Sequence, residues 1–312
     1  MRSLLFVPGD SARKLDKSLG SGADALILDL EDSVAPAGKA AARSTTAAFI
    51  QAARRETSRP RLFVRVNGLT TGLIDGDLDA VMAAGPDGIM LPKTVGGPDL
   101  SHLGAKLAVR EAEYGLDDGA TTILAIATEN ARGVFALGTL AGASHRLAGV
   151  AWGGEDLAAD LGAEANRDAA GGYTAPFRLA RSLTLLAAAG AEVDAIDSVY
   201  TDFRDLAGLA AECRDARRDG FGAKMAIHPA QVPVINEAFT PSHDALVRAR
   251  AIVALFAAAP GVGVVGLDGQ MIDRPHLKQA ERLLARAAGA TGAAERAEPG
   301  TRTVLARMPR IN

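Results

Sequence analysis

Residues 122–156, TILAIATENARGVFALGTLAGASHRLAGVAWGGED, run from one apolar segment through an alanine-rich stretch to a second apolar segment. The first apolar segment covers residues 122–127 and the second covers residues 147–152. Neither alternates between polar and apolar positions, which is typical of parallel strands that helices cover on both faces. The stretch between them has a helical composition, and Gly142 suits the left-handed conformation that ends many helices. We therefore predict a strand, a helix and a second, parallel strand.

The same alternation of short apolar runs and longer helical stretches continues over the first three quarters of the chain. The expected strands are residues 4–7, 25–30, 62–66, 88–91, 122–127, 147–152, 195–200 and 223–227. The expected helices are residues 11–19, 38–54, 100–114, 131–141, 176–189 and 206–219. Eight β–α units in one row predict a (β/α)8 TIM barrel. A doubly wound sheet is the alternative, but it often carries a glycine-rich nucleotide loop after its first strand, where this chain reads VPGD.

The pattern changes at the sequence FTPS, which separates two parts of the chain. Residues 1–239 are the expected barrel, and residues 240–312 are a C-terminal helical extension. The extension contains a long helix up to residue 259, the glycine-rich segment GVGVVGLDGQ and a last helix near residues 276–288. It is too small to fold alone, so we expect a lid that covers the barrel or reaches a neighbouring subunit. The tail from about residue 289 has few groups to bury, and we expect poor order there.

The bulk composition argues against several classes of protein. The 312 residues include 34 Lys or Arg and 37 Asp or Glu, with a net charge of −3 and no basic run, so we expect no nucleic-acid partner. The single cysteine, Cys213, excludes an intrachain disulfide framework and a zinc site of several thiolates. The apolar run at residues 4–7 is too short for a signal peptide, and no segment approaches the ~20 apolar residues of a membrane span. We therefore expect a soluble, cytoplasmic protein.

Two carboxylates stand at the ends of neighbouring expected strands. Glu129 follows the strand at residues 122–127, and Asp156 follows the strand at residues 147–152. The carboxyl ends of barrel strands carry the active site, and adjacent strands lie ~4.8 Å apart, so both carboxylates can reach one ion. Two protein oxygens at an open rim suit Mg²⁺, with Mn²⁺ as a substitute, because Mg²⁺ keeps several waters. The alternative is that both acids only stabilise the amino-terminal ends of the helices that follow them.

Arg65 lies inside the apolar run LFVRV, where an unpaired buried charge is costly. Its planar fork suits a carboxylate or an enolate oxygen, so we interpret it as a substrate-binding residue. The alternative is a structural ion pair with Asp29 or Glu31, and the two roles are compatible. Asp29, Glu31, Lys93 and His228 also follow expected strands, and we assign them supporting roles at the same rim.

Several motifs, in the same order along the chain, resemble those of the HpcH/HpaI aldolase and citrate lyase superfamily. They include RSLLFVPGDSARKLDKSLGSGADALILDLEDSV, LFVRVNG, IMLPK, IATENARGV, WGGEDLAADLG, GFGAKMAIHPAQVPVIN and GQMIDRPHLKQAERLL. The resemblance runs from Arg2 to about Leu284. It is greatest to the branch of citrate lyase β-subunit-like proteins that also contains the malyl-CoA and citramalyl-CoA lyases.

The resemblance implies a TIM barrel that binds Mg²⁺ and forms homotrimers or hexamers. By motif match, Glu129 and Asp156 take the places of the metal ligands, and Glu129 also faces the substrate. Arg65 takes the place of the catalytic, substrate-binding arginine. Asp273, in MIDRP, takes the place of an acid–base aspartate that related lyases supply from a neighbouring subunit. Lys17 lies in a basic helix that resembles a coenzyme A contact region.

The activity that the resemblance implies is a Mg²⁺-dependent carbon–carbon lyase. Its substrate would be a 3-hydroxyacyl-CoA thioester such as malyl-CoA, citramalyl-CoA or citryl-CoA, cleaved to acetyl-CoA and an oxoacid. One alternative is a malyl-CoA-type thioesterase that uses the same metal site. Another is a citrate lyase β subunit that acts on an acyl-carrier thioester.

Overall fold

Eight parallel strands close into a barrel in the computed structural model, which describes residues 1–294. The strands are β1 (Ser3–Pro8), β2 (Ala25–Asp29), β3 (Arg61–Arg65), β4 (Gly88–Leu91), β5 (Thr122–Ile126), β6 (Leu147–Ala151), β7 (Asp194–Asp197) and β8 (Ala223–Ala226). Each strand pairs with the next one along the chain, and β1 pairs with β8 to close the barrel. The (β/α)8 fold predicted from the sequence is confirmed. Most of the tail for which we expect poor order lies outside the described residues.

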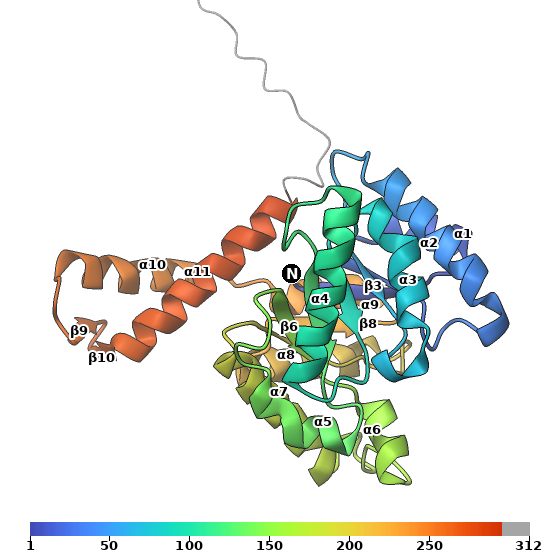
Figure 1. The fold of residues 1–312 in the computed structure, drawn as a ribbon. Helices are drawn as coiled ribbons and strands as arrows, with labels where there is room; N and C mark the ends of the chain where they lie inside the picture. The colour runs from blue at the N-terminus through green and yellow to red at the C-terminus, as the bar shows by residue number, and fades with distance from the viewer. Residues whose placement is uncertain (295–312) are drawn as a thin grey trace, which may run out of the picture.

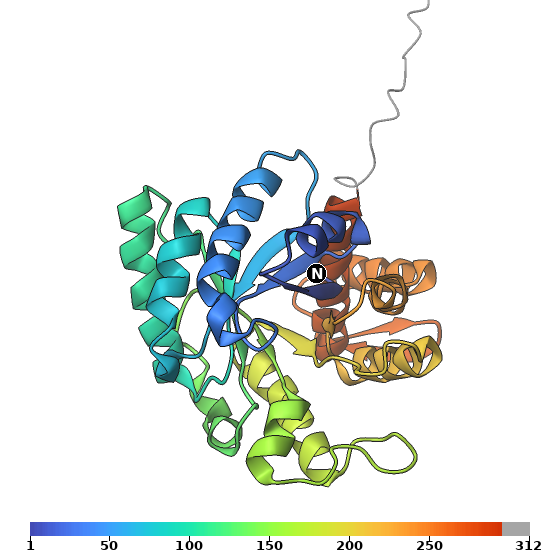
Figure 2. The same cartoon turned by 90° about the vertical axis from the view of Figure 1, so that its right-hand side faces the viewer.

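Helices surround the strands (Figures 1 and 2). They are α1 (Ala12–Ser18), α2 (Lys39–Ala53), α3 (Ile74–Val81), α4 (Gly97–Tyr114), α5 (Ala131–Ala136), α6 (Gly154–Leu161), α7 (Ala175–Gly190), α8 (Leu206–Asp219) and α9 (Gln231–Phe239). The sequence did not predict α3, α6 and α9, which have only eight or nine residues each. The helix expected up to residue 141 ends at Ala136, and a 3-10 turn (Leu137–Thr139) leads on to Gly142, whose φ is 72°.

Within residues 1–294, no helix is both long and apolar enough to cross a membrane.

Two layers of apolar side chains explain why the strands are continuous apolar runs. Ile27 belongs to the cluster inside the barrel, together with Phe63. Its neighbours Leu26 and Leu28 belong to a second cluster, which also contains Ile50 of α2. Because successive side chains of a strand point to opposite faces, a strand that is buried on both faces needs apolar residues at every position.

The C-terminal arm, residues 243–294, projects away from the barrel (Figure 1). It consists of α10 (His243–Ala258), β9 (Val264–Leu267), β10 (Gln270–Asp273) and α11 (Arg274–Ala294). A small core of its own holds it together, formed by Ala249, Ile252, Phe256, Ile272 and Ala280. The glycine-rich segment is a hairpin: β9 and β10 pair antiparallel across Asp268 and Gly269, whose φ angles of 50° and 75° fit a two-residue turn with both central residues left-handed.

Candidate active site

The carboxyl ends of five neighbouring strands bring charged side chains together at one end of the barrel, the barrel mouth. Asp29 and Arg65 are the last residues of β2 and β3. Lys93 follows β4, Glu129 follows β5, and Asp156 lies in the first turn of α6, after β6. This is the end of a TIM barrel at which active sites are built.

Arg65 is held by Asp29 on the neighbouring strand. The two residues are directly opposite in the β2–β3 register. Arg65 Nε donates to Asp29 Oδ1 at 2.7 Å, and Nη2 donates to Oδ2 at 2.7 Å. Burial acts to raise the pKa of Asp29, but the hydrogen bonds and charge of Arg65, with further donors, hold this pKa below its ordinary value. The structural ion pair considered as an alternative is therefore present, and it leaves Nη1 as the arginine nitrogen that Asp29 does not use.

Glu31 and Lys93 continue the row of charges across the mouth. Arg65 Nη1 lies 3.1 Å from Glu31 Oε2, although that buried oxygen has no hydrogen bond of good geometry. Lys93 Nζ donates to Glu31 Oε1 at 2.6 Å and lies 3.4 Å from Asp156 Oδ1. The charges therefore alternate in sign from Asp29 to Arg65, Glu31, Lys93 and Asp156. Such a row keeps each charge compensated while it leaves single atoms available to a ligand.

Glu129 lies beside this row and is also buried, with 4% of its surface exposed. The N–H of Lys93 donates to Glu129 Oε2. Burial raises the pKa of Glu129 to about 8, and the charges of Asp156 and Glu31 add to the effect. A Cβ at Gly153 would lie 2.6 Å from Glu129 Cγ, so the glycine of the WGGED motif makes room for this side chain.

Asp156 is partly exposed, with 35% of its side chain accessible. Its neighbour Glu155 accepts a hydrogen bond from Asn166 at 2.8 Å and is thereby tied to the loop after α6. Both acids lie in the first turn of α6, where negative charge is favourable, so the helix-stabilising role considered for Asp156 is also compatible with its position.

The donor set formed by Glu129 and Asp156 fits a divalent cation. After burial, the charge of Asp156 is a further cause of the raised pKa of Glu129, so a cation near both carboxylates would be favourable. Within residues 1–294, no group of three or more His, Cys, Asp or Glu side chains is arranged to hold a metal. A two-carboxylate site of this kind suits Mg²⁺, which keeps part of its shell for water and substrate oxygens.

His228 follows β8, and its side chain contacts Phe203 and the main chain of Ala230. Its ring stacks on Phe203 with the centroids 4.9 Å apart, and its Nδ1 accepts the N–H of Ala230 at 3.1 Å. These contacts describe a structural role in the loop after β8, and the supporting role assigned from the sequence stays a prediction.

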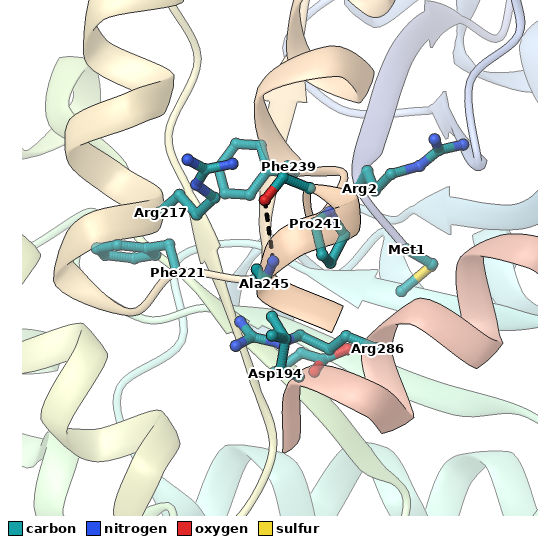
Figure 3. Close-up of a pocket in the computed structure, with 12 residues that line it drawn as sticks. Met1, Arg2, Asp194, Arg217, Phe221, Phe239, Pro241, Ala245 and Arg286 are labelled. Atoms are coloured by element: carbon teal, nitrogen blue, oxygen red, sulfur yellow. Dashed lines mark hydrogen bonds between the residues drawn. The ribbon is translucent and has the colours of Figure 1, made fainter. Parts of the chain in front are cut away.

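Asp273 ends β10, in the arm that projects away from the barrel (Figure 1). Its Oδ1 lies 2.5 Å from His276 Nδ1. The arm meets the barrel at a cavity of about 280 Å³ (Figure 3). That cavity is lined by Arg2, Asp194 and Gly222, which stand at or before the starts of β1, β7 and β8. The arm is therefore rooted at the amino-terminal end of the barrel, opposite the mouth that contains Glu129.

Residue types alone do not predict that the Lys93 N–H is a hydrogen-bond partner of Glu129. This contact depends on a left-handed backbone at Lys93, with φ of 53°, which a lysine rarely adopts. Gly153 did carry a signal, since a glycine pair after a strand often marks a close approach of backbone to another group.

This chain is similar to several known proteins. The model of a family described as HpcH/HpaI aldolase/citrate lyase matches residues 2–229. A citrate lyase subunit beta-like protein of Mycobacterium tuberculosis is 37% identical over 289 residues, which cover 92% of this chain and 96% of that protein. A (3S)-malyl-CoA thioesterase of Cereibacter sphaeroides is 34% identical over 288 residues, which cover 92% of this chain and 94% of that protein.

A solved structure is also similar. The crystal structure of CitE from Mycobacterium tuberculosis in complex with magnesium, acetoacetate and coenzyme A superposes with a TM-score of 0.71 at 35% sequence identity. The match covers 92% of this chain and 98% of that one, so it includes the arm as well as the barrel.

Proposed function

The chain belongs to the HpcH/HpaI aldolase/citrate lyase family, and we propose that it is a divalent-cation-dependent carbon–carbon lyase. Its proposed substrate is a 3-hydroxyacyl-CoA thioester such as malyl-CoA, citramalyl-CoA or citryl-CoA, and its products are acetyl-CoA and an oxoacid. The observation that carries the proposal is the convergence of Glu129, Asp156 and Arg65 at the barrel mouth. The magnesium and coenzyme A bound to the similar CitE structure support it.

In this proposal, Glu129 and Asp156 hold Mg²⁺, for which Mn²⁺ can substitute. When bound, the cation would supply Lewis-acid chemistry: it would favour transfer of the substrate hydroxyl proton to solvent and would polarise the carbonyl that forms. Burial keeps Glu129 in one position, because its Cγ lies against Gly153 and its Oε2 against the Lys93 amide.

Arg65 stabilises the negative charge that develops on the thioester oxygen. When the C2–C3 bond breaks, its electron pair moves onto the thioester and forms an enolate. Asp29 binds two nitrogens of the guanidinium and fixes its plane, so Arg65 presents the same face before and after bond cleavage. A donor that is already oriented stabilises such an oxyanion without reorganisation.

Asp273 supplies the last proton. It protonates the enolate carbon to give the acetyl group, and it acts as the base in the direction of condensation. Because the arm is rooted at the opposite end of its own barrel, we propose that Asp273 serves the site of a neighbouring subunit in a homotrimer or hexamer.

Two other outcomes would use the same site. In a malyl-CoA-type thioesterase, water hydrolyses the carbon–sulfur bond of the thioester and the carbon–carbon bond stays intact. The Cereibacter sphaeroides relative is named (3S)-malyl-CoA thioesterase. In a citrate lyase β subunit, the thioester is carried by an acyl-carrier protein, and the Mycobacterium tuberculosis relative is named for its likeness to that subunit.

A panel of thioesters tests the proposal. The purified chain is given malyl-CoA, citramalyl-CoA, β-methylmalyl-CoA and citryl-CoA with Mg²⁺ or with EDTA, and both oxoacid and free CoA are measured. A lyase releases an oxoacid and an acyl-CoA, which is propionyl-CoA from β-methylmalyl-CoA and acetyl-CoA from the other three, whereas a thioesterase releases a hydroxyacid and free CoA. Turnover that persists in EDTA, or in Glu129→Gln at the rate of the unchanged protein, would contradict the proposed cation site.

A further inference from the structure

Lys93 contacts both proposed cation ligands, each through a different part of the residue. Its main-chain N–H donates to Glu129 Oε2, and its Nζ lies 3.4 Å from Asp156 Oδ1. The main-chain contact needs the positive φ of 53°. The turn is held in this conformation over β5, where the N–H of Thr94 donates to Ile126 O at 3.2 Å. A backbone in this sparsely populated conformation indicates that the surrounding contacts fix it.

The ammonium group of Lys93 lies near three acids. Its Nζ is 2.6 Å from Glu31 Oε1, 3.4 Å from Asp32 Oδ2 and 3.4 Å from Asp156 Oδ1. The shorter contact with Glu31 means that Lys93 can leave Asp156 and still keep a charged partner. The side chain is 39% exposed and flexible, so this movement needs no change of the backbone.

We propose that Lys93 is a built-in counter-cation of the site, which competes with the divalent cation for Asp156 and withdraws to Glu31 when that cation binds. The inference rests on the cation site of the proposed function and deepens it. Two positive charges at the same carboxylate repel each other, so the ammonium weakens cation binding. In return, it gives Asp156 a charged partner when the cation is absent, and it makes the release of the cation easier.

The consequence is an affinity that rises when the lysine charge is removed. Lys93→Met keeps the N–H that binds Glu129 and a side chain of similar length, but removes the charge. For an ammonium and a divalent ion about 6 Å apart, at the water-like dielectric constant of about 80 that suits a partly exposed side chain, the repulsion corresponds to about tenfold in affinity. Lys93→Arg keeps the charge, and its affinity is expected to stay within about twofold of the unchanged protein.

The test measures Mn²⁺ binding to the full chain without any thioester, by electron paramagnetic resonance of the free ion or by calorimetry. The variants are Lys93→Met, Lys93→Arg and, as a matched control, Lys106→Met. Lys106 pairs with Asp75 at 2.7 Å on the outside of the barrel, so its loss changes the net charge equally without touching the mouth. We expect about tenfold tighter Mn²⁺ binding in Lys93→Met and little change in the other two variants.

Unchanged or weaker Mn²⁺ binding by Lys93→Met would overturn the inference, because the lysine would then support the cation instead of competing with it. Should Lys93→Met fold poorly, Lys93→Gly replaces it, since glycine keeps the N–H and adopts positive φ freely. The two levels of the argument fail differently. If the unchanged protein binds no Mn²⁺, the cation site of the proposed function fails and the inference with it; if it binds Mn²⁺ but Lys93→Met and Lys93→Gly bind no more tightly, the inference alone fails.

Discussion

Two buried carboxylates of the barrel have pKa values that are shifted in opposite directions. Asp197 lies in the barrel wall, between the strands and the outer helices, and Glu129 lies at the mouth. Asp197 accepts hydrogen bonds from Trp152 Nε1 at 2.7 Å and Lys224 Nζ at 2.9 Å, and Arg181 Nε adds a third at 3.0 Å. Burial acts to raise the pKa of Asp197, but these charges and hydrogen bonds hold it below its ordinary value. Burial raises the pKa of Glu129 to about 8.

The difference separates structural charge from functional charge in one fold. In the wall, Lys224 is fully buried and binds both Asp197 and Glu212, so each charge is compensated by the protein itself. At the mouth, Glu129 lies beside other acids and Glu31 keeps an oxygen without a hydrogen bond. A site that is meant to bind a cation and an anion gains from groups that the protein leaves incompletely paired.

The largest expected effect is a loss of stability when the ion pairs of the barrel wall are removed. Lys224→Met removes the partner of two carboxylates, and we expect the free energy of unfolding to fall by about 3–5 kcal/mol, as measured by urea denaturation. Lys106→Met is the control, because the exposed pair with Asp75 contributes at most about 1 kcal/mol. If both variants lose the same stability, the wall network is not the structural element that we describe.

The second effect is the pH dependence of stability in EDTA. Because the folded pKa of Glu129 is about 8 against an ordinary 4.5, the folded chain holds the extra proton between these values. Its contribution to the free energy of unfolding is complete below the ordinary pKa and is lost as the pH rises through the folded pKa, a change of about 3–5 kcal/mol.

Glu129→Gln should flatten this slope when urea unfolding is compared at several pH values from 5 to 9. The Asp197 carboxylate gives the opposite behaviour, since its contribution is lost as the pH falls through a lowered pKa. Equal slopes in the unchanged protein and in Glu129→Gln would show that Glu129 is an ordinary acid.

A smaller effect is expected when the packing around Glu129 at the mouth is disturbed. Gly153→Ala places a Cβ at 2.6 Å from Glu129 Cγ, and we expect a loss of about 1–3 kcal/mol in stability because the acid must shift. A displaced Glu129 would also bind Mn²⁺ more weakly, which calorimetry measures. Gly138→Ala is the matched control, since nothing lies within 4 Å of the added Cβ. Tight Mn²⁺ binding by Gly153→Ala would contradict the fit between the two residues.

The smallest expected effect is the absence of a reaction. Cys213 is fully buried in the wall, and burial raises the pKa of its thiol to about 12. The folded protein should therefore resist a thiol reagent for hours at neutral pH, whereas the protein in urea reacts at once. Rapid labelling of the folded chain would mean that the wall opens.

The sequence predicted what depends on composition along a strand. The eight apolar runs identified the barrel, and the polar residues that follow them identified Arg65, Glu129 and Asp156 as candidates. Short helices such as α3 and α6 were not predicted, because eight residues give too few turns for a clear helical period of apolar residues. The hairpin at Asp268 and Gly269 could have been found, since Asp-Gly between apolar residues favours a two-residue turn.

The pairing of charges could be predicted only in part from residue types: the pair of Arg65 with Asp29 was an expected alternative, and the structure contains it. Lys93 was available to any of several acids, and its choice of Glu31 and Asp156 follows from a backbone conformation that no local pattern announces. The opposite pKa shifts of Asp197 and Glu129 likewise depend on what lies around each acid in space.

The root of the arm at the amino-terminal end of the barrel has a genetic consequence. In the proposed function, Glu129 acts in its own barrel and Asp273 acts in the barrel of a neighbour, so a lesion in one does not affect the same active site as a lesion in the other. Glu129→Gln and Asp273→Asn chains, each inactive alone, should therefore restore some activity when they are co-expressed or refolded together. Such complementation would make two defective genes sufficient where one is not.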